Sequence, residues 1–389
     1  MLGSALGGAA IYAGLKNILD KKERDPEKDH AIAHELVWKC IGGAMQSSML
    51  YIGDKLDLYA TLRECCQTEG SSVTAVDLAT ILGFNQRWLR EWLAQQAAMG
   101  VLQLLPGQGD DDESLHYRLP KATAEVLADP SSKEYDIAVI ACVPSLVNRA
   151  KTMLPEAFRT GIGRSYDEPE VAEGIDRQHA VHIRDIFLPE VVPVAKNGHV
   201  LKLLQQGCSV ADLGCGAGNL VIAMAKAFPN SNFHGFEISE EALIIAARNI
   251  ADSKLHNVFL HDANVDSLGD HVNTYDIITT YYVLHDAPNP SELVAQVRKA
   301  MKRNGTWLLV DIACESTVRD NIAKHANPAL YFAFSVSCCM SCSLSTKGGA
   351  GLGSLGFSIP VATKMLNAGG FNYVEVLLEK QNARWFVVS

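Results

Sequence analysis

The stretch Val210–Asn219, VADLGCGAGN, places three glycines directly after a short apolar run. That run, Ser209–Leu213, has the length and composition of a buried strand, and the residues after the last glycine have helical spacing. Gly214, Gly216 and Gly218 let the backbone turn tightly and approach a ligand, and the N-terminus of the following helix presents free N–H groups. The pattern predicts a strand, a ligand-binding loop and a helix.

Short apolar runs alternate with helical stretches through the rest of this half of the chain. Five strands are predicted at 209–213, 232–236, 258–261, 275–281 and 306–312, and helices near 218–228, 239–251 and 291–303. A last helix over 360–368 precedes two strands joined by a short turn, which must pair antiparallel. Alternating strands and helices predict an α/β class with a Rossmann-like, mostly parallel seven-stranded sheet that ends in an antiparallel hairpin.

Acidic side chains follow three of these strands, at the edge where open α/β sheets bind ligands. Glu237 ends the second strand, 25 residues after Asp212, where a carboxylate accepts hydrogen bonds from ribose hydroxyls. Asp262 and Ala263 end the third strand, in position to meet an adenine edge. Asp212 would repel a pyrophosphate but suits an ammonium group. These features, with Cys215 inside the loop, fit S-adenosylmethionine as cofactor and S-adenosylhomocysteine as product.

The N-terminal half predicts a different module. Helices are expected over 31–52 and 53–66, then a short helix that stops near Gly83 and another that stops at Gly100. Two β-like runs, VLQLL and HYRLP, follow around the loop PGQGDDDESL. The order of helix, turn, helix and two-stranded wing is the topology of a winged helix. Because the wing tip carries four consecutive acids at 110–113, DNA binding is disfavoured.

Taken together, residues 201–389 resemble a class I S-adenosylmethionine-dependent methyltransferase, with VADLGCGAGN as its glycine motif and FEIS as its ribose-binding acid. From about residue 50 onward the chain resembles small-molecule methyltransferases with an N-terminal winged helix, related to plant-type O-methyltransferases. It is most similar to a bacterial and invertebrate group with stretches like SCCMSCSLSTKGGAGLG. The resemblance implies a small-molecule oxygen or thiol acceptor, and a winged helix that serves packing or homodimer formation.

The domains expected from these patterns cover the whole chain. They are an apolar N-terminal segment and linker at 1–28, a winged-helix domain at 29–125, a helical connector at 126–200 and the methyltransferase domain at 201–389, with a lid insertion at 313–359. A loop as long as this insertion usually has a functional role.

The fourth strand delivers His285 and Asp286 to the carboxyl edge of the sheet, where plant-type O-methyltransferases place their catalytic His-Asp pair. An imidazole can remove a proton from the acceptor near neutral pH, and Asp311, at the end of strand five, is the carboxylate expected to orient the ring. The plant-type pattern continues with Trp and a second acid, but this chain has Ala287 and Pro288. Two roles for His285 therefore stay open: general base, or structural or substrate-binding histidine.

Several other side chains are candidates for the acceptor pocket, and each has packing as its alternative role. They are Tyr166, His179 and His182 in the connector and Tyr331, Phe334 and Met340 in the lid insertion.

Composition limits the partners. The chain of 389 residues has 44 acidic and 34 basic side chains, a net charge of −10, which argues against a nucleic-acid partner. Its ten cysteines are scattered, which favours reduced thiols and a cytoplasmic location. Cys339 and Cys342 form a CxxC pair with no second pair, so no metal site is expected. Residues 1–19 are too short an apolar segment to span a bilayer; packing on protein is favoured, with peripheral membrane contact as the alternative.

Three rival functions remain from the sequence. A winged-helix transcriptional regulator would need a basic face. A nucleic-acid methyltransferase would need an Asn/Asp-Pro-Pro-aromatic motif after strand four, where this chain has HDAP. A catalytically silent scaffold that binds the cofactor would keep the glycine loop and have no turnover.

Overall fold

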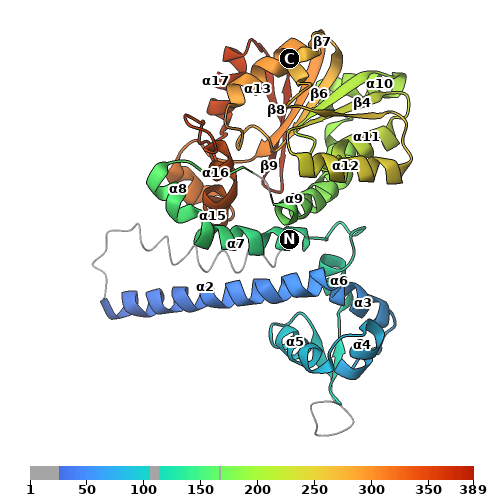
Figure 1. Cartoon of the computed structure of the whole chain (residues 1–389), viewed down its shortest axis with the longest axis vertical. Coiled ribbons are helices and arrows are strands. Elements are labelled where there is room, and N and C mark those ends of the chain that lie inside the picture. Colours follow the sequence, from blue (N-terminus) through green and yellow to red (C-terminus); the bar gives the residue numbers. More distant parts are fainter. Residues whose placement is uncertain (1–25, 106–113, 166–167) are drawn as a thin grey trace. The chain divides into compact units, whose positions relative to one another are not determined.

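The computed structural model describes residues 26–105, 114–165 and 168–389 (Figure 1). The acidic wing tip at 110–113, the apolar segment 1–19 and Tyr166 lie outside the described residues. The chain divides after Pro144 into two compact units, and each is described by itself. This boundary cuts the expected connector, because residues 126–144 belong to the first unit and 145–200 to the second.

The N-terminal unit is built mainly of helices. Its elements are α2 (Pro26–Lys55), α3 (Leu58–Cys65), α4 (Ala75–Leu82), α5 (Gln86–Ala98), β1 (Gln103–Leu105), β2 (His116–Arg118), α6 (Lys121–Leu127) and η1 (Ala138–Cys142). The first predicted helix is longer than expected and continues to Lys55. The backbone leaves the helical conformation after it, at Asp57, whose φ of 54° is left-handed.

Local signals in the sequence explain the helix–turn–helix and wing of this unit. Thr74 caps α4 through a capping box with Asp77, and Gly83 ends that helix at a φ of 68°. Asn85 then caps α5. Strands β1 and β2 pair antiparallel, as the two runs around the wing predicted.

The C-terminal unit begins with helices and continues with the sheet. Its helices are α7 (Val143–Thr152), α8 (Leu154–Thr160), α9 (Pro169–His182), η2 (Ile183–Val191), η3 (Ala195–Gly198), α10 (His199–Gln206), α11 (Asn219–Ala227), α12 (Glu240–Ser253), η4 (Leu268–Asp270), α13 (Pro290–Ala300), α14 (Val318–Lys324), α15 (Pro328–Phe334), η5 (Ser335–Cys339), α16 (Met340–Ser343) and α17 (Ile359–Ala368). Its strands are β3 (Ser209–Leu213), β4 (Asn232–Glu237), β5 (Val258–Asp262), β6 (Tyr275–Tyr281), β7 (Met301–Ile312), β8 (Val374–Lys380) and β9 (Ala383–Val388).

The seven strands form one sheet in the order β5-β4-β3-β6-β7-β9-β8. The first five are parallel, and β9 pairs antiparallel with both β7 and β8. The predicted α/β sheet and its closing hairpin are therefore confirmed. One hydrophobic core joins the sheet to α10, α11 and η2, and a second joins it to α13 and α17, so helices cover both faces (Figure 1).

Two details differ from the expectations. Helix α13 ends at Ala300 rather than near 303, and β7 starts at Met301, because Met301 pairs with Tyr275 before a register shift. About half of the insertion 313–359 is helical: α14, α15, η5 and α16 lie in it. Thr317 caps α14, and Pro328 occupies the first turn of α15, so the start signals were present in the sequence.

Candidate active site

The glycine loop between β3 and α11 has a backbone that only glycine adopts readily. Gly214, Gly216 and Gly218 have φ values of 75°, 54° and 85°. A Cβ on Gly214 would also lie 2.7 Å from the side chain of Val283. The N–H groups of Gly214 and buried Cys215 donate to Phe236 O at 2.8 and 3.1 Å, which ties the loop to β4.

Glu237, at the end of β4, is held in one orientation beside this loop. Its Oε2 accepts a hydrogen bond from the Gly216 N–H at 2.8 Å. Its Oε1 accepts from the N–H groups of Ile238 and Ser239 at 2.8 and 3.0 Å. Three backbone donors thus fix a carboxylate at the carboxyl edge of the sheet.

Asp262 lies opposite Glu237 in the parallel register of β5 and β4. Its Oδ1 accepts from both the backbone N–H and the side-chain amide of Asn264, at 3.0 and 2.9 Å. The N–H of Ala263 donates to Glu237 O at 2.9 Å. The structure therefore brings together the acids at 237 and 262, which the sequence placed 25 residues apart.

Asp212 is a buried acid on the strand that leads into the loop. The hydroxyl of Thr279 donates to its Oδ1 at 2.6 Å. Burial raises the pKa of Asp212 to about 7, the charge of Glu237 adds to the rise, and the Thr279 hydrogen bond opposes it. A positively charged group next to this carboxyl would favour its ionised form.

Helix α9 adds two residues to the site, and the sequence had pointed to only one of them. Asp176 was not predicted. Its backbone oxygen accepts from the Asn219 side chain at 2.9 Å, and burial raises the pKa of its carboxyl to about 7. His179, a predicted substrate contact, stacks on Tyr282 at 4.9 Å between ring centroids. The spacing of 176 and 179 on one helical face was the signal available in the sequence.

His179 is neutral in this setting. Part of its ring stays accessible, but protein atoms surround most of it, and this desolvation lowers its pKa to about 3. The neighbouring His182 and His285 also lower the pKa of His179. His179 is thus close enough to His285 for their charges to interact.

His285 and Asp311 meet as expected, at the ends of neighbouring strands. Both side chains are buried, and His285 Nδ1 lies 2.7 Å from Asp311 Oδ1. This is an ion-pair distance, and Asp311 acts on the ring chiefly through its charge. The backbone N–H groups of Ile312 and His285 donate to the two Asp311 oxygens at 2.7 and 3.3 Å.

The protonation of His285 reflects two opposing effects. Burial alone would lower its pKa, but the Asp311 charge outweighs this, and Cys339 and Asp286 add to it, so the pKa lies well above the ordinary histidine value. The Cys339 thiol is also a hydrogen-bond partner of His285. Cys339 was not among the predicted site residues, although it lies in the SCCMSC stretch.

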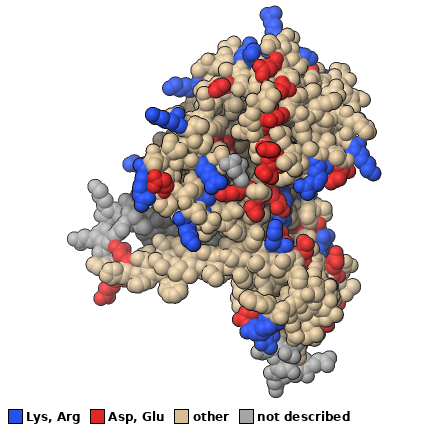
Figure 2. Space-filling model, in the orientation of Figure 1, with Lys and Arg blue, Asp and Glu red and all other residues tan. Residues whose placement is uncertain are grey.

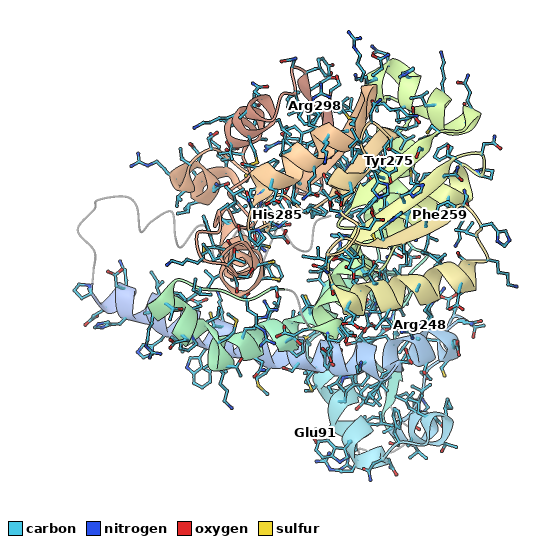
Figure 3. All side chains as sticks on the ribbon, turned by 45° about the horizontal axis from the view of Figure 1, so that its top comes forward. Glu91, Arg248, Phe259, Tyr275, His285 and Arg298 are labelled. Carbon is cyan, nitrogen blue, oxygen red and sulfur yellow. The ribbon has the colours of Figure 1, made fainter. Side chains whose placement is uncertain are left out.

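The lid insertion supplies the remaining candidates. Tyr331 packs against Phe334 with ring centroids 6.4 Å apart, and it is near enough to contribute to the raised pKa of Tyr282, the ring on which His179 stacks. Met340 lies farther along, next to Gly353, whose N–H donates to His285 O at 2.9 Å. In Figure 3, His285 lies beside the lid helices and away from Tyr275 and Phe259 on the sheet.

A buried arginine ties this lid to the segment before α9. Arg149 Nε donates to Glu168 Oε2 at 2.9 Å, and its other nitrogens donate to Ser337 O at 2.9 Å and Ser165 O at 3.4 Å. The arginine side chain is buried, while Glu168 retains partial exposure. One guanidinium thus joins α7, the segment before α9 and η5.

Replacing Arg149 by methionine, which keeps the aliphatic stem, should lower the free energy of unfolding by about 1–3 kcal/mol. The loss follows because buried carbonyl acceptors lose their charged donor. Urea unfolding followed by circular dichroism measures it. The matched control is Arg159→Met, whose ion pair is exposed on both sides and should contribute little. Equal stability of the two variants would contradict the role given to Arg149.

No helix among the described residues is both long and apolar enough to cross a membrane.

Comparison with known proteins supports the fold and the domain. A family model described as a methyltransferase domain matches residues 204–347. A demethylmenaquinone methyltransferase from Halalkalibacterium halodurans is 31% identical over 103 residues, which are 26% of this chain and 42% of that protein. A second, from Listeria monocytogenes, is 28% identical over 31% of this chain and 50% of that protein. The chain thus matches half or less of the length of these curated relatives.

Two solved structures match nearly the whole chain. Human N-acetylserotonin methyltransferase, solved in complex with SAM, aligns with a TM-score of 0.66 and 15% identity, covering 95% of this chain and 99% of that one. The mitomycin 7-O-methyltransferase MmcR aligns with a TM-score of 0.63 and 18% identity, covering 93% and 99%. The protein therefore has the fold of these two methyltransferases, and residues 204–347 match a methyltransferase domain.

Proposed function

We propose that this protein transfers a methyl group from S-adenosylmethionine to an oxygen or thiol nucleophile of a small molecule. The observation that carries the proposal is the carboxyl edge of the sheet. There the glycine loop, Asp212, Glu237 and Asp262 lie on β3, β4 and β5, and the His285–Asp311 pair lies next to them at β6 and β7. A binding region and a proton acceptor thus share one edge.

The residues present fit this cofactor. Buried Asp212 suits a positively charged amino group, Glu237 suits two ribose hydroxyls, and Asp262 with Ala263 suits an adenine edge. When bound, the cofactor supplies an electrophilic methyl group on a positively charged sulfur. The protein's part is to align the acceptor and to remove its proton.

His285 is the group proposed to take that proton. Its Nδ1 faces Asp311, which stabilises the charged imidazolium that proton transfer creates. The Cys339 thiol is a hydrogen-bond partner of His285, so it lies beside the ring that an acceptor hydroxyl or thiol has to reach. His179, Tyr331, Phe334 and Met340 are proposed to line the acceptor side, and His182 is proposed as a more distant contact.

Mass spectrometry of reactions with a panel of phenols and thiols tests the activity directly. We expect S-adenosylhomocysteine and a methylated product in equal amounts. Binding of S-adenosylhomocysteine without product from any acceptor would instead favour the silent scaffold, and failure of both would overturn the cofactor site as well.

Cofactor affinity should fall as the pH drops below about 7. Asp212 has a pKa of about 7, so it is ionised above this pH and protonated below it, where its attraction for an ammonium group is lost. Calorimetric titration with S-adenosylmethionine between about pH 6 and pH 8 measures this change.

A Thr279→Val variant separates Asp212 from Asp176, which titrates in the same range. Removing the Thr279 hydrogen bond should raise the Asp212 pKa further, so the loss of affinity should begin at a higher pH. An identical pH dependence in variant and wild type would mean that Asp212 does not meet the amino group.

The partners and location are proposed on narrower grounds. On the face shown in Figure 2, basic side chains are interspersed with acidic ones, which supports a small-molecule rather than a nucleic-acid substrate. None of the ten cysteines, all of which lie in the described residues, is in a disulfide, which supports a reducing compartment such as the cytoplasm. Exposed apolar residues on α2, including Trp38 and Met45, support a homodimer. Light scattering tests the dimer, and a monomer at all concentrations would contradict it.

A further inference from the structure

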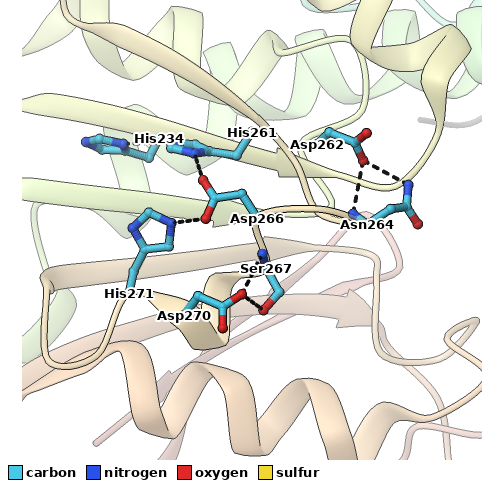
Figure 4. Close-up of polar contacts among 8 residues, drawn as sticks. All are labelled: His234, His261, Asp262, Asn264, Asp266, Ser267, Asp270 and His271. Carbon is cyan, nitrogen blue, oxygen red and sulfur yellow. Dashed lines mark hydrogen bonds and ion pairs between the residues drawn. The ribbon is translucent and has the colours of Figure 1, made fainter.

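A cluster of three histidines and one aspartate lies next to Asp262, at strands β4 and β5 of the sheet (Figure 4). His234 lies on β4, His261 on β5, and Asp266 and His271 lie on the chain between β5 and β6. Asp266 bridges two of the rings: its Oδ2 is 2.6 Å from His261 Nδ1, and its Oδ1 is 2.8 Å from His271 Nε2. The nearby rings of Tyr275 and Phe259 are distant from His285 in Figure 3, so the cluster is separate from the methyl-transfer chemistry proposed above.

Aromatic packing fixes the two rings that face Asp266. His261 stacks on Phe236 with ring centroids 4.4 Å apart and planes 10° apart. His271 meets the same phenyl ring edge-on at 5.2 Å. The directions of the two nitrogen lone pairs are therefore set by the hydrophobic core beneath them, and little rotamer freedom is lost when a ligand binds.

His234 lies behind His261, on the side of the ring away from Asp266. His261 Nε2 lies 3.0 Å from His234 Nδ1, and the His234 ring is held between Phe259 and Tyr275. A histidine that binds a metal through one nitrogen usually donates its other N–H to a fixed acceptor, which sets its tautomer. His234 provides such an acceptor for His261.

We propose that His261 Nδ1, a carboxylate oxygen of Asp266 and His271 Nε2 bind a divalent transition-metal ion of the Zn²⁺ type. These three ligand atoms lie within 4.8 Å of one another, and the described residues contain no other such group of His, Cys, Asp and Glu. Two imidazoles and one carboxylate suit Zn²⁺, Co²⁺ or Fe²⁺, whereas Mg²⁺ and Ca²⁺ prefer all-oxygen sites.

Binding requires a small and balanced rearrangement. Each imidazole must offer a lone pair to the ion. By exchange with water, His261 moves its proton from Nδ1 to Nε2, where Nδ1 of His234 accepts the hydrogen bond, and His271 moves its proton from Nε2 to Nδ1, so both rings stay neutral. The ion replaces the two hydrogen bonds to Asp266. The side chain of Asp266 is 45% exposed, that of His271 24% and that of His261 16%, so the carboxylate can move and water can complete the coordination.

The site touches the proposed cofactor region through one turn. The N–H of Asp266 donates to Asp262 O at 2.8 Å, and the side chain of Asp262 holds Asn264. A metal on Asp266 would thus hold the turn that follows β5.

Zinc titration of the metal-free, reduced full chain by calorimetry tests the proposal. The wild type should bind one more equivalent of Zn²⁺ than His271→Ala, and Asp266→Asn, at a half-exposed position, should bind at least tenfold more weakly. His256→Ala is the matched control, because His256 is exposed on the loop before β5 and should leave binding unchanged. Circular dichroism checks that each variant is folded.

Cobalt spectroscopy distinguishes this site from the ten thiols. Co²⁺ in the wild type should show ligand-field bands of nitrogen and oxygen ligands, and these bands should be lost in His271→Ala. Equal stoichiometry and affinity in the wild type, His271→Ala and Asp266→Asn would show that the cluster is only a hydrogen-bonded network and would overturn the proposal. So would a spectrum that contains only thiolate charge-transfer bands.

Discussion

Replacing His285 by alanine should lower kcat by about 100- to 10,000-fold, the range for loss of a positioned general base. The affinity for S-adenosylhomocysteine should change little, because the residues proposed to hold the cofactor, Asp212 and Glu237, lie on other strands. The side chain is buried and lies 2.7 Å from Asp311, so the ring is held in place as proton acceptor. Steady-state turnover and calorimetry of the same preparation separate the two effects.

The control is His199→Ala, which removes an exposed histidine from the start of α10. It should keep full turnover. If His285→Ala also kept full turnover, His285 would be a packing residue, and alignment of the acceptor alone would account for the rate.

The pH dependence of turnover distinguishes a general base at His285 from a residue that only packs, because only a base would set the acidic limb of the profile. The pKa of His285 lies well above the ordinary histidine value, so the ring is protonated below that pKa and can accept a proton only above it. The acidic limb of kcat/KM should therefore lie at unusually high pH in the wild type. Asp311→Asn removes the charge that raises the pKa, so the limb should shift to lower pH. If the acidic limb of kcat/KM stayed at the same pH in Asp311→Asn, it would report a group other than His285.

Replacing Glu237 by alanine should weaken S-adenosylhomocysteine binding roughly 100-fold or more, since two charge-assisted hydrogen bonds to ribose contribute about 1.5–3 kcal/mol each. The carboxylate is already oriented by the N–H groups of Gly216, Ile238 and Ser239, so it binds without reorganisation. Its removal also frees the Gly216 N–H, which loosens the glycine loop. Calorimetric titration measures the change in Kd.

Two further variants sharpen this test. Glu240→Ala removes an exposed acid from the first turn of α12 and should bind normally. Glu237→Gln keeps one oxygen acceptor and should lie between alanine and wild type. Normal binding by Glu237→Ala would contradict the ribose role of this residue.

Local chemistry explains why much of the fold was predictable. The strand Ser209–Leu213, the three glycines with positive φ and the caps at Thr74 and Asn85 are each decided within a few residues. The acids that follow strands had to reach the carboxyl edge, because parallel strands end there together. The helices of the lid insertion were missed although Thr317 and Pro328 marked them, because the glycine-rich, small-residue composition suggested a loop.

The sequence by itself thus determined the α/β sheet, the glycine loop and the acids beside it, since burial period and turn chemistry are local properties. Only the tertiary structure decided which distant side chains meet. Cys339 reaches His285 across 54 residues, and Asp176 reaches the loop from another helix. The cluster around Asp266 arises because β5 lies beside β4 in a fixed register, which sets His261 against His234. The order of these parallel strands depends on packing of the whole sheet, because the helices that connect them do not specify it as a tight hairpin turn would.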